Sequence, residues 1–225
     1  WGSSAAGLRT KARIGDEDLD IKFRLGLEGP AKVEGSKRLF GKIPMVIFVE
    51  DDIEIVRGGD VFRRRFIDQV ATFVDGKHWH NLHEYYKVLR QRNTLLKNFS
   101  SNGGKGLDEW DSQLIKYGEL IRRRRSSVTR DINRLSHELH LEEKSGESLD
   151  IYYQESGFNL RDVRNREIEK GLTLQGPHLD KVGINLNGRE ARIYASYGQK
   201  RNAVLSLKIA EIELYKEIKG QYTIL

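Results

Sequence analysis

Seven consecutive residues near the carboxyl end of the chain carry groups that bind anions in proteins. They read Ala195-Ser196-Tyr197-Gly198-Gln199-Lys200-Arg201, and a long amphipathic stretch follows them. A hydroxyl, a glycine and an amide at a helix start present backbone N–H groups and the positive end of the helix dipole to a phosphate. The same residue types also suit a plain helix start, in which Ser196 caps the helix and Gly198 relieves the turn. These seven residues by themselves leave both interpretations open.

A second chemical candidate is an acidic segment that follows the apolar run at residues 43–49. This segment reads Val49-Glu50-Asp51-Asp52. A carboxylate can bind a hard cation or orient a water molecule, so Glu50 could act beside a magnesium ion. The alternative is an exposed acidic turn, and the sequence favours neither.

A run of four arginines forms the third candidate. It reads Arg122-Arg123-Arg124-Arg125, and Arg130 and Arg134 extend its charge along the same predicted helix. Guanidinium groups placed around a helix would neutralise DNA phosphates without reading base sequence. The alternative is a solvated helix face that pairs with acidic neighbours such as Glu119 and Asp131.

The composition restricts the class of protein. The 225 residues carry a formal net charge of +6, which modestly favours polyanionic partners such as nucleic acid. Cysteine is absent, so the sequence offers no disulfide and no thiolate zinc site. No apolar stretch reaches the length needed to cross a bilayer, and we expect a soluble, cytoplasmic protein. The start at Trp1 and the strand-like residues 222–225 are interpreted as truncated ends.

These candidate residues must be positioned by a mixed α/β fold interrupted by helices. Residues 1–58 have strand-like patterns, including alternation over residues 19–25 and an apolar run at 43–49 that predicts a central strand. Residues 59–98 have helical periodicity with a break at Asp75-Gly76, and a glycine-rich loop at 100–106 leads to a second helix over 107–141. This order predicts an antiparallel helical hairpin, which acts as an arm over residues 59–145.

Residues 146–225 become mixed again. We predict strands at 148–154, 172–175, 182–186 and 189–193, a helix at 160–169, and a last helix over about 199–219. Asn187-Gly188 between two of these strands is a strong signal for a two-residue hairpin. Residues 1–58 and 146–225 are therefore expected to rejoin in one α/β head.

Several segments together resemble one known family. Residues 195–201 and the helix after them resemble the signature motif of ABC-type ATPases in the form found in the RecF family: serine, any residue, glycine, glutamine, any residue, arginine. Three further segments match that family in the same order: Gly176-Pro177-His178-Leu179-Asp180, the apolar run with Arg63-Arg64-Arg65-Phe66-Ile67-Asp68, and the helix with Arg92-Asn93. The acidic segment departs from the family, which usually has a proline where this chain has Val49.

The resemblance implies an ABC-type ATPase head that forms an ATP-dependent homodimer. By resemblance, Ser196, Gly198, Gln199 and Arg201 contact ATP held by the other subunit, and Glu50 lies near Mg²⁺ and the attacking water as a catalytic residue. The family implies a weak DNA-stimulated ATPase that binds single-strand to duplex junctions, recruits RecR and helps load a recombinase. No G-x-x-x-x-G-K-[ST] motif occurs in the chain, and no apolar strand ends in paired acids, so this segment alone is not expected to hydrolyse ATP.

Two other interpretations remain from the sequence. Another SMC-type ATPase would share the signature but would have arms of hundreds of residues, and the short hairpin argues against it. A non-catalytic module that only dimerises or docks a partner belongs to a different class. The residues flanking the two ends would separate this module from the ATPase.

Overall fold

Helices predominate in the computed structural model, which describes residues 6–14, 17–25, 32–34, 46, 48–142 and 147–220, the first three ranges by their backbone. Two small antiparallel sheets accompany the helices. Within the described residues, no helix combines the length and the apolar character needed to cross a bilayer. The chain is thus a mostly helical protein with small antiparallel sheets.

The first sheet contains β1 (Ala6–Ile14), β2 (Glu17–Leu25) and β3 (Lys32–Glu34) in that order. Its strands pair antiparallel, with Ala6 opposite Leu25 and Val33 opposite Phe23. The alternation at residues 19–25 predicted β2 correctly. The predicted central strand at 43–49 lies partly outside the described residues, and its described members Val46, Phe48 and Val49 are not in a strand. Val46 is buried because it packs in a hydrophobic core, which explains its apolar character without a strand.

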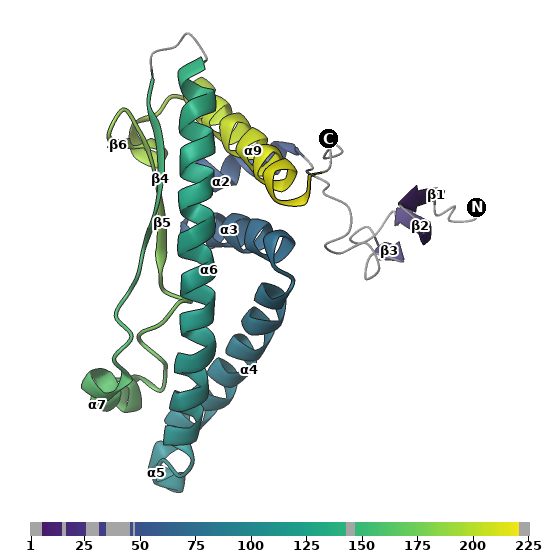
Figure 1. Ribbon diagram of the computed structural model, residues 1–225. Helices are drawn as coiled ribbons and strands as arrows, with labels where there is room; N and C mark the ends of the chain where they lie inside the picture. Colours follow the sequence, from purple (N-terminus) through teal and green to yellow (C-terminus); the bar gives the residue numbers. More distant parts are fainter. Residues whose placement is uncertain are drawn as a thin grey trace, which may run out of the picture.

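The arm is an antiparallel helical hairpin, as the sequence predicted. After a short turn η1 (Glu50–Ile53) and α2 (Glu54–Arg57), the chain forms α3 (Asp60–Val74) and α4 (Lys77–Lys97). The short α5 (Phe99–Asn102) and three glycines with positive φ, Gly103, Gly104 and Gly106, then reverse the chain into α6 (Leu107–Glu142). Figure 1 shows α4 beside the lower half of α6 and α3 beside its middle. The break between α3 and α4 is at Asp75-Gly76, as expected.

The second sheet lies along the other side of α6 (Figure 1). It contains β4 (Leu149–Gln154), β5 (Lys181–Leu186) and the short β6 (Arg189–Glu190). Along the sequence, α7 (Leu160–Lys170) connects β4 to β5. Asn187 and Gly188 have φ of 51° and 72°, which is the backbone of the predicted two-residue turn. The chain continues into α8 (Ala191–Tyr194) and the long α9 (Tyr197–Lys219). The strand predicted at 189–193 therefore ends after Glu190.

The strand predicted at residues 172–175 is wrong, and side chains explain why. The Thr173 N–H donates to Asn93 Oδ1 at 2.9 Å, and the Leu174 N–H donates to Glu167 Oε1 at 2.8 Å. These side chains satisfy the backbone donors that a neighbouring strand would otherwise have to satisfy. The segment is therefore a loop that these hydrogen bonds hold against α4 and α7.

Two apolar cores follow each other along α6. The first packs α2, α3 and α9 against the second sheet, and α6 contributes Val128, Ile132 and Leu135 to it. The second lies inside the arm, where Leu114 and Ile121 of α6 meet Tyr85 and Val88 of α4. The first core joins residues from all three predicted segments, and α6 contributes side chains to both cores.

Between the two ends of the arm, a buried arginine ties four segments together. Arg92 is fully buried and donates to Asp111 at 2.6 Å, to Glu167 at 2.5 Å and to the Thr173 hydroxyl at 2.7 Å. Two carboxylates and a hydroxyl satisfy a buried guanidinium that would otherwise be very costly to desolvate. The Arg-Asn pair that resembled the family thus holds α4, α6, α7 and the loop after α7 in place.

Candidate functional site

The start of α9 is an N-terminal capping box built from Ser196 and Gln199. The Gln199 N–H donates to Ser196 Oγ at 3.2 Å, and the Ser196 N–H donates back to Gln199 Oε1 at 2.8 Å. This reciprocal pair fixes the first turn of the helix. The capping interpretation of Ser196 is therefore correct.

Capping leaves Ser196 able to bind an anion as well. Its oxygen accepts from Gln199, but among the described residues no acceptor takes the hydroxyl proton, and a serine hydroxyl can do both at once. The N–H groups of Tyr197 and Gly198 belong to the first helical turn, whose donors have no acceptor inside the helix. A Cβ placed on Gly198 would meet no atom within 4 Å, so the space in front of this turn is open. The turn can therefore offer three donors to a phosphate.

The four predicted signature residues differ in exposure. Ser196, Gly198 and Arg201 are exposed, whereas Gln199 is half-buried and its Nε2 donates to Glu147 just before β4. Tyr197, between the serine and the glycine, has 57% of its surface exposed. The turn is thus on the molecular surface, where a second molecule could reach it.

Glu50 is exposed at the start of η1, which packs beside α9. The turn is fixed by Asp52, whose carboxylate accepts from the Val49 N–H at 2.9 Å. Next to it, Asp51, Asp52 and Glu54 line a pocket of about 420 Å³ together with Lys208. Glu50 itself does not line this pocket. The described residues contain no group of three or more side chains that could hold a metal ion.

The four arginines of α6 have different environments. Arg122 and Arg125 are buried and bind carboxylates of their own chain, whereas Arg123 is exposed and Arg124 is half-buried. Burial and carboxylate partners favour internal ion pairs over DNA contact for Arg122 and Arg125. DNA binding by the arginine run stays a prediction. A four-residue run on a helix necessarily turns some members inward. The alternative of internal pairing holds for these two.

Arg125 binds Asp68 of α3 in the middle of the molecule. Its Nε and Nη2 donate to the two carboxylate oxygens of Asp68, both at 2.8 Å, and Nη1 donates to the Pro177 carbonyl at 2.6 Å. His78 Nε2 lies 2.9 Å from Asp68 Oδ1. Burial alone would raise the pKa of Asp68, but the hydrogen bond with His78 and the positive charge of Arg125 hold that pKa below its usual value.

Arg122 makes an equivalent contact with Asp180. Its Nε and Nη2 donate to the two carboxylate oxygens at 2.9 and 2.7 Å, and the Tyr153 hydroxyl donates to the same carboxylate. The Ser156 N–H adds a further donor at 2.8 Å. Burial opposes ionisation of Asp180, yet these donors keep its pKa below the usual value. The acids of two family-like segments, Asp68 and Asp180, thus serve to anchor the arginines of α6.

The glycine and histidine before Asp180 also have structural partners. Gly176 has a φ of 127°, and a Cβ there would lie 2.6 Å from the Tyr85 hydroxyl, so no larger residue fits. His178 Nδ1 lies 2.7 Å from the same hydroxyl. Burial lowers the pKa of His178, which therefore stays neutral near physiological pH. This agrees with a turn histidine whose ring is satisfied by its neighbours.

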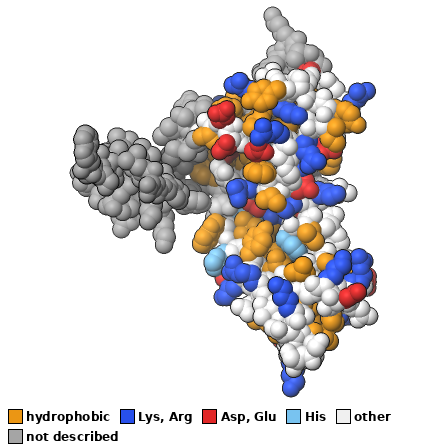
Figure 2. All heavy atoms as spheres, turned by 180° about the vertical axis from the view of Figure 1, so that it is seen from behind, with side chains coloured by type: hydrophobic (Ala, Val, Ile, Leu, Met, Phe, Trp, Pro, Cys, Tyr) orange, Lys and Arg blue, Asp and Glu red, His pale blue; other side chains and the backbone are white. Residues whose placement is uncertain are grey.

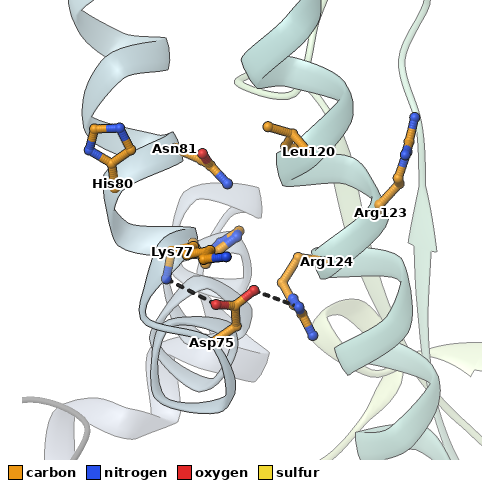
Figure 3. A pocket seen from close by; sticks show the side chains of 8 residues that line it. Asp75, Lys77, His80, Asn81, Leu120, Arg123 and Arg124 are labelled. Atoms are coloured by element: carbon orange, nitrogen blue, oxygen red, sulfur yellow. Dashed lines mark hydrogen bonds and ion pairs between the residues drawn. The ribbon is translucent and has the colours of Figure 1, made fainter.

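Arg123 and Arg124 are among the residues that line a groove beside α4 and α6. In Figure 3 Arg124 points toward Asp75, whereas Arg123 extends along the side of α6 that faces away from α4. The groove has a volume of about 620 Å³, and its other polar lining residues include Lys77, His80 and Asn81. Its one carboxylate, Asp75, accepts from Arg124 Nη2 at 2.6 Å and from the Lys77 N–H at 3.0 Å. The groove therefore has an excess of positive charge. Figure 2 shows Lys and Arg side chains on the opposite face from Figure 1, separated by apolar and acidic ones.

Comparison with known proteins places the chain in a family. No family model matches it. It is 37% identical over 233 residues to the DNA replication and repair protein RecF of Lachnoclostridium phytofermentans, with 96% of this chain and 65% of that protein covered. It is 31% identical over 245 residues to the RecF of Clostridium novyi, with 100% of this chain and 67% of that protein covered. The chain therefore belongs to the RecF family.

Solved structures agree with this assignment. A structure described as the recombination mediator protein RecF-ATP in the RecFOR pathway superposes with a TM-score of 0.84 at 30% identity, covering 97% of this chain and 65% of that one. A related structure with an ATP analogue gives a TM-score of 0.82. The chain spans 57% of the length of the Clostridium perfringens RecF, to which it is 36% identical.

Sequence reasoning did not predict Glu147 or the partners of the buried arginines. Glu147 is 52 positions from Gln199, and no local pattern connects them. Asp68 and Asp180 did carry a signal, because each is the acid of a segment that resembled the family. That signal marked them as notable without revealing which basic residue each one binds.

Proposed function

We propose that this chain is the part of a RecF-type ATPase that completes the ATP site of a second copy. In this proposal the segments 1–58 and 146–225 belong to an ABC-type head, and residues 59–145 form its inserted arm. The observation that supports it is the exposed, preorganised start of α9, with donors from Ser196, Tyr197 and Gly198 that no described residue uses. The solved RecF relative is described as a complex with ATP, whose phosphate groups are anions of the kind that these donors can bind.

In this proposal each residue of the site has a role that follows from its chemistry. The Ser196 hydroxyl and the first N–H groups of α9 donate to the γ-phosphate of ATP bound by the other subunit. Arg201, one turn further along the same helix, adds positive charge near that phosphate. Gln199 holds the turn rather than touching the nucleotide. Glu50 would supply one carboxylate to a Mg²⁺ bound with the triphosphate, and it would orient the attacking water.

ATP thereby controls the association of two subunits around DNA. The groove with Lys77, Arg123 and Arg124 is the DNA contact of the arm, because it carries most of the exposed guanidinium charge of the arginine run. The proposed setting is recombinational repair in the cytoplasm, where the dimer acts at gapped DNA, recruits RecR and helps load the recombinase. The family membership and the RecFOR pathway of the solved relative support this assignment.

Sedimentation of the full-length protein tests the proposal. Wild-type protein should be monomeric without nucleotide and dimeric with ATP and Mg²⁺. Ser196→Arg should stay monomeric in both conditions, because a bulky cation occupies the space in front of the turn. A wild-type protein whose association state does not respond to ATP would contradict the mechanism and would favour a simple docking module.

A further inference from the structure

Beyond the signature residues, Glu147 holds the amide of Gln199 from outside the motif. Gln199 Nε2 donates to Glu147 Oε1, and both residues are half-buried. Glu147 comes two residues before β4, so this contact joins α9 to the segment that leads into the sheet. We propose that Glu147 is a positioning residue for the signature turn, and this inference rests on the proposed function of that turn.

The chemistry of the two side chains explains why the contact matters. An amide has one acceptor oxygen and one donor nitrogen, and the capping box requires that the oxygen of Gln199 face the Ser196 N–H. The nitrogen must then point the other way. An ionised carboxylate accepts hydrogen bonds and donates none, so Glu147 binds only this orientation of the amide. The reversed amide would place N–H against N–H at Ser196 and oxygen against oxygen at Glu147.

Glu147 is itself attached to the sheet rather than to α9. The N–H of the next residue, Ser148, donates to Asn187 Oδ1 at 2.8 Å, and the Asn187 N–H donates to the Ser148 carbonyl at 2.9 Å. Asn187 is the first residue of the tight turn between β5 and β6. The carboxylate therefore projects from a backbone that two hydrogen bonds fix, which makes it a firm support for the first turn of α9.

The useful property of Glu147 is its acceptor oxygen rather than its charge. A negative charge near the start of α9 would oppose an incoming phosphate, whereas a fixed Gln199 keeps the Ser196 oxygen engaged and its proton directed outward. Glu147→Gln removes the charge and retains an acceptor oxygen, and Glu147→Ala removes both. The two variants therefore separate a positioning role from an electrostatic one.

The first experiment needs no nucleotide. Amide hydrogen exchange at Ser196 and Gln199, whose N–H groups close the capping box, should be several-fold faster in Glu147→Ala than in wild type, because the box opens more often. Glu147→Gln should exchange within about twofold of wild type, since the acceptor that closes the box is retained. Glu169→Ala, an exposed glutamate on α7, is the matched control and should leave this exchange unchanged.

The second experiment measures the ATP concentration at which half of the full-length protein is dimeric. Glu147→Ala should raise it about five- to tenfold, the effect of one lost hydrogen bond in this range, and Glu147→Gln should restore it. Equal damage by both variants, or tighter dimerisation by Glu147→Ala, would overturn the positioning role. Unchanged exchange in Glu147→Ala would overturn it as well. A wild type that ignores ATP would instead refute the proposed function, and the exchange data would still decide whether Glu147 orders the turn.

Discussion

Arg125 of α6 binds both carboxylate oxygens of Asp68 of α3 at 2.8 Å, with the guanidinium fully buried. The pair joins the long helix α6 to α3. Arg122 and Asp180 repeat the arrangement toward the loop before β5. An arginine run that resembled a DNA-binding strip therefore supplies two internal anchors, which fix the direction in which the remaining two arginines point.

Removing Asp68 should destabilise the fold strongly. Asp68→Ala leaves the buried Arg125 without its counter-charge, and the free energy of unfolding should fall by about 3–5 kcal/mol, as for other buried ion pairs. Urea unfolding followed by circular dichroism measures the change. The matched control is Glu119→Ala, which removes the exposed partner of Arg123 and should cost less than about 1 kcal/mol. A loss of similar size in both variants would contradict the assigned roles.

Stability should fall in two stages as the pH is lowered. Burial lowers the pKa of His178 in the folded protein, so the unfolded chain takes up a proton first, and stability is lost as the pH falls below the usual value of 6.5. The pKa values of Asp68 and Asp180 are also lowered, so their stabilisation is present above the usual value of 3.8 and is lost below it.

The unfolding free energy measured between pH 8 and pH 3 checks this prediction. His178→Gln should reduce the first fall, and the exposed His80→Gln should leave it unchanged. An identical pH profile for His178→Gln and wild type would show that the histidine does not carry the first stage.

Gly198→Ala should weaken ATP-dependent dimer formation without lowering the stability of the free protein. A Cβ at this position meets nothing within 4 Å, and alanine favours a helix over glycine by about 1 kcal/mol, so the free protein should be as stable or slightly more stable. In the proposed function the phosphate enters the space that this methyl group would occupy, so ATP-dependent dimer formation should weaken at least several-fold. Dimer formation equal to wild type would mean that the phosphate does not approach the backbone there.

DNA affinity should depend on Arg123 and Arg124, the two arginines of the run that line the groove. Arg123→Ala with Arg124→Ala should weaken binding and reduce the salt slope by about 1–2, since each lost phosphate contact lowers it by about 0.9. Fluorescence anisotropy at several salt concentrations measures both quantities. The control replaces Arg161 and Arg166, exposed on α7, by alanine and so removes the same charge. Equal losses in the two double variants would mean that only net charge matters.

Local patterns predicted most helices because the information lies within a few residues. The break at Asp75-Gly76, the glycine turn after α5 and the Asn187-Gly188 hairpin each follow from nearby residue types. Residues 172–175 were misassigned because their β-branched and apolar composition is also typical of a strand. Their backbone partners, Asn93 and Glu167, lie on other elements, which composition does not reveal.

The candidate site was predictable only in part. The sequence singled out Ser196 and Gly198 because a helix start that suits an anion has a local signature, and the structure places both residues on the surface at the start of α9. The separation of Arg122 and Arg125 from Arg123 and Arg124 was not predictable, because it depends on carboxylates 57 and 58 positions away. The same holds for Glu147, whose role depends on where the tight turn after β5 places it.

The contact between the start of α9 and the nucleotide of the partner subunit can be measured by hydrogen exchange at residues 196–201 of the full-length protein, with and without ATP. These amides should become protected only when ATP is present and only at protein concentrations at which dimers form. Protection that is independent of protein concentration, or no protection in an ATP-bound dimer, would contradict a signature turn that binds the nucleotide of its partner.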